Sequence, residues 1–490
     1  MVDLTILPTF KTAGITVVII SLALLFKTLH RAYFTSLSKI PGPWYASLTH
    51  LVLRYHILTG NRVHYIHALH HTYGPVVRIS PVEVSCASLS SFLTIHPVSK
   101  PFLKSTWYQR LVPPPAGILS MIDPKEHAAR RKLFSQAFSK SFLKTNWEPE
   151  VRKKATMAVE KIKKNALINE VDILTYFTFM ATDVVAHLAF GESFKTLETE
   201  KKTQLVIDLQ HEINRGTLRA EIPNLFAIGK YLRIPGLQTG EARIREYGIL
   251  AVKNAKSHSQ ANPTIFRKAL SESKTENAEG SMSDENILQE AAFFIVVGTD
   301  TTANSITYIL YNILKDRNLQ KQLEDEVETL GEDFEAKDVE QLVLLNAVID
   351  EGMRLYGAAP GSLPRVVPNG GAVLDGYQVP GGVTVSTQSW TIHRDPEIFP
   401  EPDSFRPERW LENKSNDMKA AYHPFGSGTR TCIGIHLARM EIWLALALFL
   451  RECKGARIAS SQSDDDMVPI NSFVIEPKGG KCMITMKDGY

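Results

Sequence analysis

Apolar residues recur at helical intervals in two long stretches of the chain. The first extends from Ile287 to Ile313, and the second from Ile433 to Leu450. Apolar positions three and four residues apart are typical of helices that bury one face. Ser281 and Asp284 resemble a capping box at the start of the first stretch. We therefore predict two long helices, the first of them buried in the core.

The distribution of proline separates helical from extended regions. No proline occurs between Thr264 and Ala359, whereas eight occur from Pro360 to Pro407. Proline is excluded from helix interiors and is common in turns and at strand edges. The pattern predicts a mainly α fold with a small β portion. A hydrophobic content of 44% in 490 residues, without a long disordered linker, favours one large domain.

The N-terminus carries a separate apolar segment. Fifteen uncharged residues, Thr12 to Phe26, lie between two lysines, and upstream apolar residues extend the segment to about the twenty residues that span a membrane. A cleaved signal peptide is the alternative, but no small-x-small cleavage site follows. The basic residues that do follow place the rest of the chain in the cytosol. We predict a membrane anchor at 1–30, a basic and proline-rich hinge at 31–45 and one folded domain at 46–490.

Charge and cysteine content narrow the possible partners and compartments. The net charge is +3, from 55 basic and 52 acidic residues, which argues against nucleic acid as a partner. Four cysteines without a regular spacing fit a reducing compartment.

Residues 425–434, Phe-Gly-Ser-Gly-Thr-Arg-Thr-Cys-Ile-Gly, form the most specific motif. Two glycines let the backbone turn tightly and approach a bulky planar group. Cys432 lies at or just before the start of the second helix, where the partial positive charge of a helix N-terminus stabilises a thiolate. Arg430 adds a cation suited to bidentate carboxylate contact. A thiolate beside a carboxylate-binding cation suggests haem.

Other roles for the four cysteines have less support in the sequence. Cys86, Cys453 and Cys482 are more simply explained as small buried hydrophobes. Zinc would need several ligands, and no Cys-x-x-Cys or His-x-x-x-His cluster lies near Cys432. A nucleophilic Cys432 remains an alternative, although no protease or transferase signature surrounds it.

The buried helix contains polar residues in its middle. Gly298, Asp300, Thr301 and Thr302 interrupt the apolar pattern of residues 291–302. Buried polar groups need partners or a function. They fit either a kinked core helix, whose hydroxyls bond to the preceding turn, or a functional site.

Together these motifs resemble the cytochromes P-450, the haem-thiolate monooxygenases. The pattern Phe-x-x-Gly-x-Arg-x-Cys-x-Gly is met at every fixed position. Glu351-Gly-Met-Arg354 resembles the family's Glu-x-x-Arg, and Phe405-Arg-Pro-Glu-Arg409-Trp resembles the segment whose arginine completes a buried network with that pair. The resemblance implies the cytochrome P-450 fold in one catalytic domain with an N-terminal transmembrane helix. It also implies that Glu351, Arg354 and Arg409 support the cysteine loop.

The resemblance further assigns roles to individual residues. Cys432 would be the axial ligand of the iron of haem b, and Asp300 with Thr301 would be the acid-alcohol pair that relays protons to dioxygen. Val297 departs from the family, which most often has alanine or glycine there, and its bulk narrows the approach to the haem or shifts the helix. The expected cofactor-binding residues, four of them contacting the haem propionates, are His127, Arg131, Arg365, Arg430, Phe425 and Gly434.

The implied function is monooxygenation of a hydrophobic small molecule with dioxygen, by hydroxylation, epoxidation or successive oxidation. No complete Gly-x-Gly-x-x-Gly after a strand and no Walker loop is present, so electrons would come from a separate NADPH-dependent cytochrome reductase. The resemblance places the protein in the endoplasmic reticulum membrane, single-pass, with the catalytic domain in the cytosol. It is strongest to filamentous-fungal members that act on secondary metabolites. The alternative is a haem-thiolate isomerase or dehydratase, or a non-catalytic haem-binding protein, that needs no reductase.

The resemblance also gives the expected wall of the substrate pocket. The segments concerned are mostly apolar or small, which fits a hydrophobic substrate. They are Phe102–Ile118, Phe294–Thr302, Ala358–Leu363 and the surroundings of Phe473.

Overall fold

The computed structural model describes residues 6–113, 117–234, 246, 249, 252–253, 264–266, 282–471 and 473–487, without side chains for 6–14 and for a few positions of residues 17–251. The predicted cap residue Ser281 lies outside this part of the chain, as do residues 1–5 of the predicted anchor and 114–116 of the predicted pocket wall.

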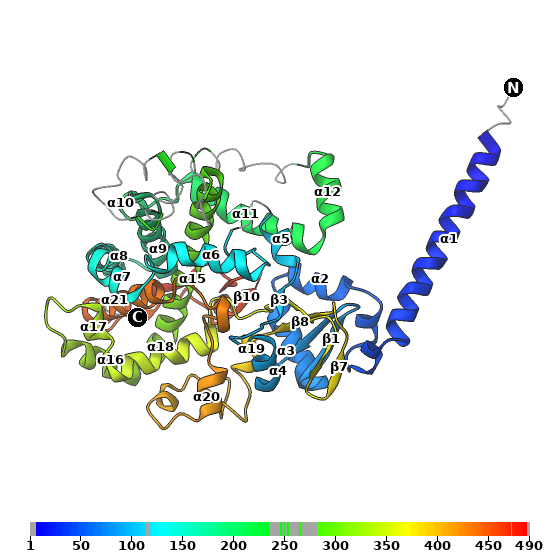
Figure 1. Cartoon of the computed structure of the whole chain (residues 1–490). Coiled ribbons are helices and arrows are strands. Elements are labelled where there is room, and N and C mark those ends of the chain that lie inside the picture. Colours follow the sequence, from blue (N-terminus) through cyan, green and yellow to red (C-terminus); the bar gives the residue numbers. More distant parts are fainter. Residues whose placement is uncertain are drawn as a thin grey trace.

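The domain is a bundle of helices with a small sheet region beside it (Figure 1). The helices before the central one are α1 (Ile6–Tyr33), α2 (Leu51–Leu58), α3 (Arg62–Tyr73), α4 (Leu89–Ile95), α5 (Trp107–Leu111), α6 (Pro124–Ser135), α7 (Lys140–Asn146), α8 (Glu148–Ala166), α9 (Ile173–Phe190), α10 (Thr196–Thr199), α11 (Gln204–Glu221) and α12 (Pro223–Tyr231). The central helix and those after it are α15 (Asp284–Lys315), α16 (Arg317–Glu328), α17 (Ala336–Val339), α18 (Val343–Tyr356), α19 (Ser389–Ile392), α20 (Asn416–Ala421) and α21 (Ile435–Glu452).

The central helix α15 confirms the predicted buried helix and is slightly longer than the periodicity suggested. Its N-cap is Ser283, whose side chain accepts a hydrogen bond from the Asn286 amide, so the cap lies two residues after the predicted Ser281. α15 packs against α9, and a Cβ at Gly298 would lie only 2.9 Å from Cγ2 of Val185. Glycine is therefore needed where the two helices approach most closely.

Helix α9 is the one described helix that is long and apolar enough to cross a membrane by composition, and 83% of it is buried inside the domain. Its burial against α8 and α15 accounts for its apolar sequence. α9 is therefore a core helix of the bundle.

The strands form four small sheets. The largest has the order β1-β2-β8-β5-β3, and a second has the order β4-β12-β9. The pairs β6-β7 and β10-β11 complete the set. The strands are β1 (Val76–Ser80), β2 (Glu83–Cys86), β3 (Leu103–Lys104), β4 (Val171–Asp172), β5 (Arg365–Val366), β6 (Ala372–Leu374), β7 (Tyr377–Val379), β8 (Thr384–Thr387), β9 (Arg457–Ile458), β10 (Pro469–Asn471), β11 (Ile475–Pro477) and β12 (Met483–Thr485).

The predicted β portion after Pro360 is confirmed by β5 to β8, but only β5 and β8 belong to the largest sheet, whose other three strands come from the N-terminal part of the chain. β8 pairs in parallel with β2, with Glu83 opposite Thr384 and Cys86 opposite Thr387. The proline pattern gave no signal for the N-terminal strands, because pairing between such distant segments depends on tertiary packing.

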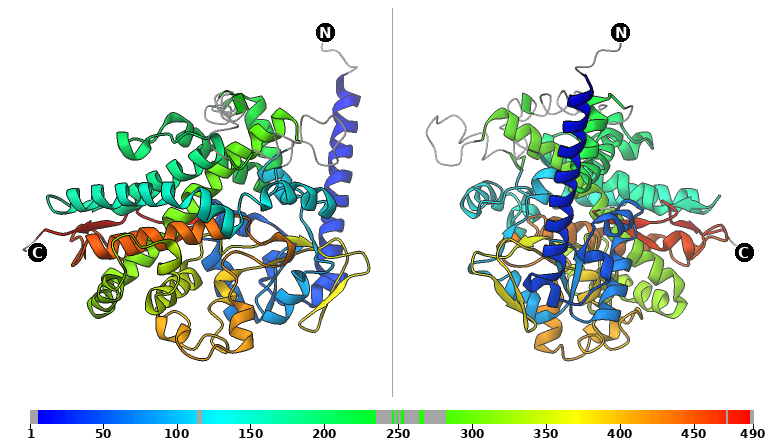
Figure 2. Two further views of the ribbon diagram at one scale, coloured as in Figure 1. Left: turned by 60° about the vertical axis from the view of Figure 1, so that its left-hand side comes forward. Right: turned by 90° about the vertical axis from the view of Figure 1, so that its right-hand side faces the viewer.

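Residues 6–30 of the predicted anchor lie in a single helix, α1, which stands apart from the domain (Figure 1) and whose N-terminal end projects beyond it (Figure 2). Its large apolar side chains from Ile15 to Leu29, where described, are exposed, including Ile19 at 60% and Phe26 at 70%. The end of α1 is fastened to the domain by Arg78, whose guanidinium donates to the carbonyl oxygens of Arg31 and Ala32. The direction in which α1 leaves the domain is therefore fixed by a buried arginine.

Candidate functional site

A cavity of about 310 Å³ lies between α15, the loop before α21, and the β5 region. All nine residues predicted for catalysis and cofactor binding line it: His127, Arg131, Asp300, Thr301, Arg365, Phe425, Arg430, Cys432 and Gly434. They come from four separate parts of the sequence, so the fold brings the predicted motifs to one place.

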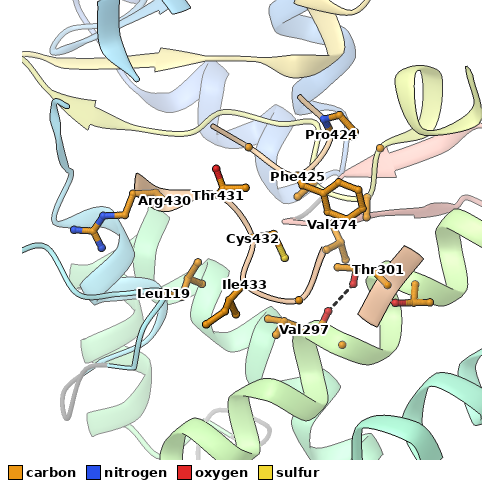
Figure 3. Close-up of a pocket in the computed structure, with 18 of the residues that line it drawn as sticks. Leu119, Val297, Thr301, Pro424, Phe425, Arg430, Thr431, Cys432, Ile433 and Val474 are labelled. Carbon is orange, nitrogen blue, oxygen red and sulfur yellow. Dashed lines mark hydrogen bonds between the residues drawn. The ribbon is translucent and has the colours of Figure 1, made fainter. Parts of the chain in front are cut away.

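Cys432 lies on the loop that crosses one side of this cavity (Figure 3). Its amide donates to the Phe425 carbonyl at 2.9 Å, which closes the loop. Gly426 and Gly428 have φ values of 74° and 64°, a region that favours glycine. A Cβ at Gly428 would lie 2.8 Å from the His96 carbonyl oxygen. The glycines thus let the loop turn close to neighbouring backbone and present one thiol to the cavity.

The electrostatics of Cys432 differ from the sequence-based prediction. Gly434 is the N-cap of α21, so the cysteine stands two residues before the helix cap. Burial raises the pKa of the Cys432 thiol, and the Gly434 amide and the positive charge of Arg131 only partly offset this effect. The expected stabilisation of the thiolate by the helix terminus is present through the Gly434 amide, but burial outweighs it.

Buried cations gather at one edge of the cavity. Lys104, Arg365 and Arg430 lie near one another, and burial together with the charges of the two arginines lowers the pKa of Lys104 well below its usual range. Burial and neighbouring Arg365 likewise lower the pKa of Arg430 to about 10. Within the described part of the chain, none of these three forms an ion pair with a carboxylate.

The hydrogen bonds of these cations go to neutral acceptors, which are backbone carbonyl groups and, for Arg365, also the Tyr108 hydroxyl at 3.3 Å. Lys104 Nζ donates to the Leu119 oxygen at 2.6 Å, and Arg430 donates to the oxygens of Met121 and Ile122 at 2.9 and 3.1 Å. Arg365 donates to the Pro364 oxygen at 3.1 Å. Neutral acceptors hold the side chains in place but leave their charge uncompensated.

His127 and Arg131 approach the same region from α6. Burial and the nearby charges of Arg430, Lys104 and Arg131 lower the pKa of His127 to about 3, so its imidazole is neutral. Arg131 donates to the Thr431 oxygen at 2.7 Å, directly before the cysteine. Arg131 therefore links α6 to the loop that carries the thiol.

The residues present fit haem. Burial of several cations without anions is unfavourable unless an anionic ligand supplies the missing charge. Two carboxylates at one edge of the cavity and a metal facing Cys432 would satisfy both the cations and the thiol. The propionates and iron of haem b have this chemistry.

On the opposite side of the cavity, α15 presents Val297, Asp300 and Thr301. The Thr301 hydroxyl donates to the Val297 carbonyl at 2.6 Å (Figure 3), so it bonds to the preceding turn as an ordinary buried helix threonine does. Its donor is thus occupied, while its oxygen can still accept a hydrogen bond. Asp300 lies close enough to Glu476 of β11 that its charge contributes to raising the pKa of Glu476, mainly a result of burial.

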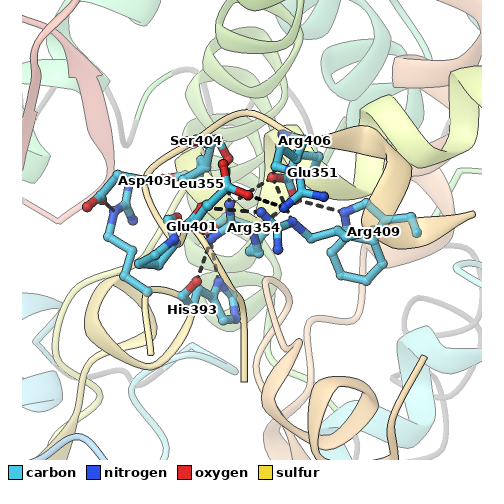
Figure 4. Close-up of polar contacts among 12 residues, drawn as sticks. Glu351, Arg354, Leu355, His393, Glu401, Asp403, Ser404, Arg406 and Arg409 are labelled. Atoms are coloured by element: carbon cyan, nitrogen blue, oxygen red, sulfur yellow. Dashed lines mark hydrogen bonds and ion pairs between the residues drawn. The ribbon is translucent and has the colours of Figure 1, made fainter. Parts of the chain in front are cut away.

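The predicted charge network is present behind the cysteine loop (Figure 4). Arg354 donates from Nε and Nη2 to the two oxygens of Glu351, each at 2.8 Å, and Arg409 Nε donates to the same carboxylate at 3.1 Å. The Arg406 amide and the Trp410 indole donate to it as well. Burial would raise the pKa of Glu351, but the Arg354 guanidinium and these other donors hold it below its usual range.

His393 connects this network to the cysteine loop. Arg354 Nη1 donates to the His393 carbonyl at 2.6 Å, and the His393 ring contacts the Arg354 carbonyl through Nδ1. Nε2 of the same ring accepts from the His423 amide at 3.1 Å. His423 stands two residues before Phe425, so the network holds the start of the loop through one buried imidazole.

Sequence reasoning missed several residues of the cavity and its surroundings. Lys104 lies in a segment predicted to be apolar, and His393 belongs to no motif. Glu441 lines the cavity from α21, is 2% exposed, and has one carboxylate oxygen without a hydrogen-bond partner among the described residues. Burial raises the pKa of Glu441 well above its usual range. Its charge between apolar neighbours in the 433–450 stretch was the available signal.

The predicted pocket wall is largely confirmed, with some changes. Phe102 packs in a separate core cluster, whereas Lys104, Tyr108 and Ile118 from the same segment line the cavity. Val474 lies in the predicted surroundings of Phe473, whereas Leu119, Phe138, Val185 and Phe293 line the cavity without having been predicted.

Comparison with known proteins agrees with this geometry. The chain matches the family model described as Cytochrome P450 over residues 39–484. It is 40% identical over 469 residues to cytochrome P450 monooxygenase stcB of Emericella nidulans, which covers 93% of this chain and 89% of that protein. It is also 40% identical over 474 residues to cytochrome P450 monooxygenase cypX of Dothistroma septosporum, covering 93% and 92%, respectively. Cytochrome P450 monooxygenase aflV of Aspergillus parasiticus is 36% identical over 475 residues, covering 94% of each chain.

Glu351→Gln is expected to lower the unfolding midpoint strongly. The amide keeps the shape of the side chain but leaves the buried charges of Arg354 and Arg409 without a counter-charge, at a cost of about 3–5 kcal/mol. Thermal unfolding of the full chain in detergent measures the effect. The control is Asp325→Asn, which removes an exposed ion pair with Lys321 and should leave the midpoint unchanged. Equal midpoints for the two variants would contradict a structural role for Glu351.

Proposed function

The chain belongs to the cytochrome P450 family, and from this membership we propose that Cys432 is the axial thiolate ligand of its haem iron. The protein is a haem-thiolate monooxygenase, as its relatives are named. The observation that carries the assignment of Cys432 is that its thiol faces the same cavity as the buried cations and the polar segment of α15. When bound, haem supplies the iron that binds dioxygen and receives electrons.

The propionates are bound, in this proposal, by Lys104, Arg365 and Arg430, with His127 and Arg131 beside them. Three of these side chains are held in place by backbone carbonyls, so little side-chain entropy is lost when the carboxylates arrive. Lys104 is added to the set that the sequence predicted. Phe425 and Gly434 complete the wall around the thiol.

Asp300 and Thr301 are proposed to deliver protons. The Thr301 hydroxyl donates to Val297 in the described structure, so its oxygen is left to accept a hydrogen bond from a water in the cavity. Asp300 can supply protons from the side of β11, where Glu476 lies. Val297, which lines the cavity one turn before Thr301, narrows the space in which the substrate must lie.

Monooxygenation needs dioxygen, a small-molecule substrate and a reductase partner. One oxygen atom enters the substrate and the other leaves as water, with two electrons and two protons supplied from outside. We propose that an NADPH-dependent cytochrome reductase supplies the electrons and docks on the Cys432 side of the domain. The absence of nucleotide-binding motifs from the sequence supports a separate reductase.

The substrate is proposed to be a hydrophobic compound of fungal secondary metabolism. Apolar side chains dominate the cavity on the α15 side, including Val297, Phe293, Phe294, Leu363 and Phe473. Such a wall binds by shape and apolar burial, with few polar contacts. The fungal origin of the relatives supports the second part of the proposal.

We also propose that the protein is held on the endoplasmic reticulum membrane by residues 1–30, with the hinge at 31–45 and the catalytic domain at 46–490 in the cytosol. α1 carries exposed apolar side chains along its described part. α12 lies at the end of the domain toward which α1 extends (Figure 1), and its Leu225, Ile228 and Tyr231 are 64%, 53% and 86% exposed. An apolar helix face beside the apolar helix α1 fits a domain that rests on a lipid surface.

Cys432→Ser is expected to abolish the reduced carbon-monoxide difference band that is characteristic of thiolate-ligated haem, because an alcohol oxygen does not replace the thiolate as a ligand. Cys453→Ser is the control, since that thiol is buried away from the cavity. Persistence of the thiolate-type band in Cys432→Ser would show that Cys432 is not the axial ligand.

Thr301→Ala is expected to uncouple NADPH oxidation from product formation by about tenfold or more, because the proton relay loses its hydroxyl. The measurement compares NADPH consumed, product formed and hydrogen peroxide released in the presence of reductase. Thr307→Ala is the control on the same helix, since its hydroxyl bonds to the preceding turn away from the cavity. Unchanged coupling in Thr301→Ala would count against the relay, and turnover without reductase would favour the isomerase or dehydratase alternative.

Deletion of residues 1–30 is expected to release the protein from microsomal membranes into an alkaline carbonate wash, whereas the full chain stays in the pellet. The deletion variant should still bind phospholipid vesicles, and Ile228→Ser with Tyr231→Ser should weaken that binding. Extraction of the full chain by carbonate would contradict the proposed span.

A further inference from the structure

The loop of residues 117–122 forms the wall of the cavity between α15 and the buried cations. Ile118 and Leu119 of this loop line the cavity. The loop makes little regular structure of its own, with amides of Ser120 and Met121 donating to the Gly117 carbonyl. Its position is therefore set by the groups that hold it from outside.

Lys104 and Arg430 hold the far end of the loop through three backbone carbonyls. These are cations of the proposed propionate site, so that end depends on the cofactor. The near end of the loop is held by a side chain of α15.

Glu290, two turns before Val297 on α15, holds the near end. Its Oε1 accepts from the Ile118 amide at 2.8 Å and from Arg130 Nη1 at 3.0 Å. The carboxylate is fully buried, whereas the side chain of Arg130 is 11% exposed. One oxygen therefore joins three elements: α15, the loop and α6.

The second oxygen of Glu290 faces the loop backbone. A Cβ at Gly117 would lie 3.2 Å from Oε2, and this oxygen has no hydrogen-bond partner among the described residues. The neighbouring Gln289 donates to the Pro113 carbonyl at 3.1 Å. Pro113 and Ile118 are thus both bound by side chains at this end of α15, and Gly117 stands where a Cβ would crowd the Glu290 carboxylate.

A buried carboxylate is costly, and a site that only needed packing would be served by an apolar residue. Burial raises the pKa of Glu290 to about 7 in spite of Arg130 and the Ile118 amide. Two observations of geometry indicate what the buried Glu290 carboxylate does. It binds the backbone of a residue that lines the cavity, and it lies close to Gly117.

We propose that Glu290 is a specificity-determining positioning residue, which sets how far Ile118 and Leu119 extend over the cavity and so limits the size of the ligand that reaches the haem. The inference rests on the proposed function, because the cavity must hold haem and substrate for the loop to select between ligands. Glu290 itself does not touch the reacting atoms. It acts through the loop.

The test uses two ligands that bind haem iron directly and differ in size, imidazole and clotrimazole. Dissociation constants are measured by difference spectroscopy on the full-length holoprotein. Glu290→Gln keeps the shape of the side chain and removes its charge, so its hydrogen bonds to the Ile118 amide and to Arg130 weaken and the loop is held less tightly. We expect the ratio of the clotrimazole constant to the imidazole constant to fall at least fivefold, with imidazole binding within twofold of the unsubstituted protein.

Gly117→Ala provides a second variant in case Glu290→Gln does not fold, because it pushes the loop away while both charges remain. It should lower the same ratio. Glu332→Gln, an exposed carboxylate far from the cavity, is the matched control and should leave the ratio unchanged.

The outcomes separate this inference from the proposed function. An unchanged ratio in folded Glu290→Gln and Gly117→Ala, or an equal weakening of both ligands, overturns the role of Glu290 while the thiolate-type carbon-monoxide band is retained. Absence of that band and of azole binding in the unsubstituted protein overturns the proposed function instead.

Discussion

The buried carboxylate of Glu351 is the interaction on which the site depends. Five donors converge on its two oxygens, from Arg354, Arg406, Arg409 and Trp410. A charge so enclosed cannot lose a partner cheaply, so the segments that supply the donors are fixed relative to α18. His393 extends that rigidity to the start of the cysteine loop. The position of one thiol is thus determined by a network that never touches it.

The cations at the edge of the cavity, unlike the charges around Glu351, form no ion pair with a carboxylate in the described part of the protein. Around Glu351 the protein supplies every counter-charge, whereas at the cavity edge it buries Lys104, Arg365 and Arg430 on neutral carbonyl oxygens. The first arrangement makes a scaffold that is complete without a ligand. The second makes a site whose electrostatic energy is lowest when a dianionic ligand is present. Tight retention of the cofactor follows from this contrast.

Features that depend on local sequence could be predicted, and those that depend on tertiary burial could not. The helices α15 and α21, the glycine turns before Cys432 and the Glu351–Arg354 spacing are local patterns, and the structure has all of them. The parallel pairing of β2 with β8, and the burial of Lys104 and Glu290, join segments far apart in the chain. The burial of Cys432 also depends on tertiary packing, and its effect on the pKa of the thiol outweighs that of the helix terminus.

The pairing of β2 with β8 also constrains the order in which the protein is made. Residues 83–86 pair with β1 along one edge but find the partner for their other edge only at 384–387, and the loop that carries the thiol follows later still. During synthesis one edge of β2 therefore stays unpaired until about 300 further residues have been added. Cofactor capture is consequently an event of late or completed translation.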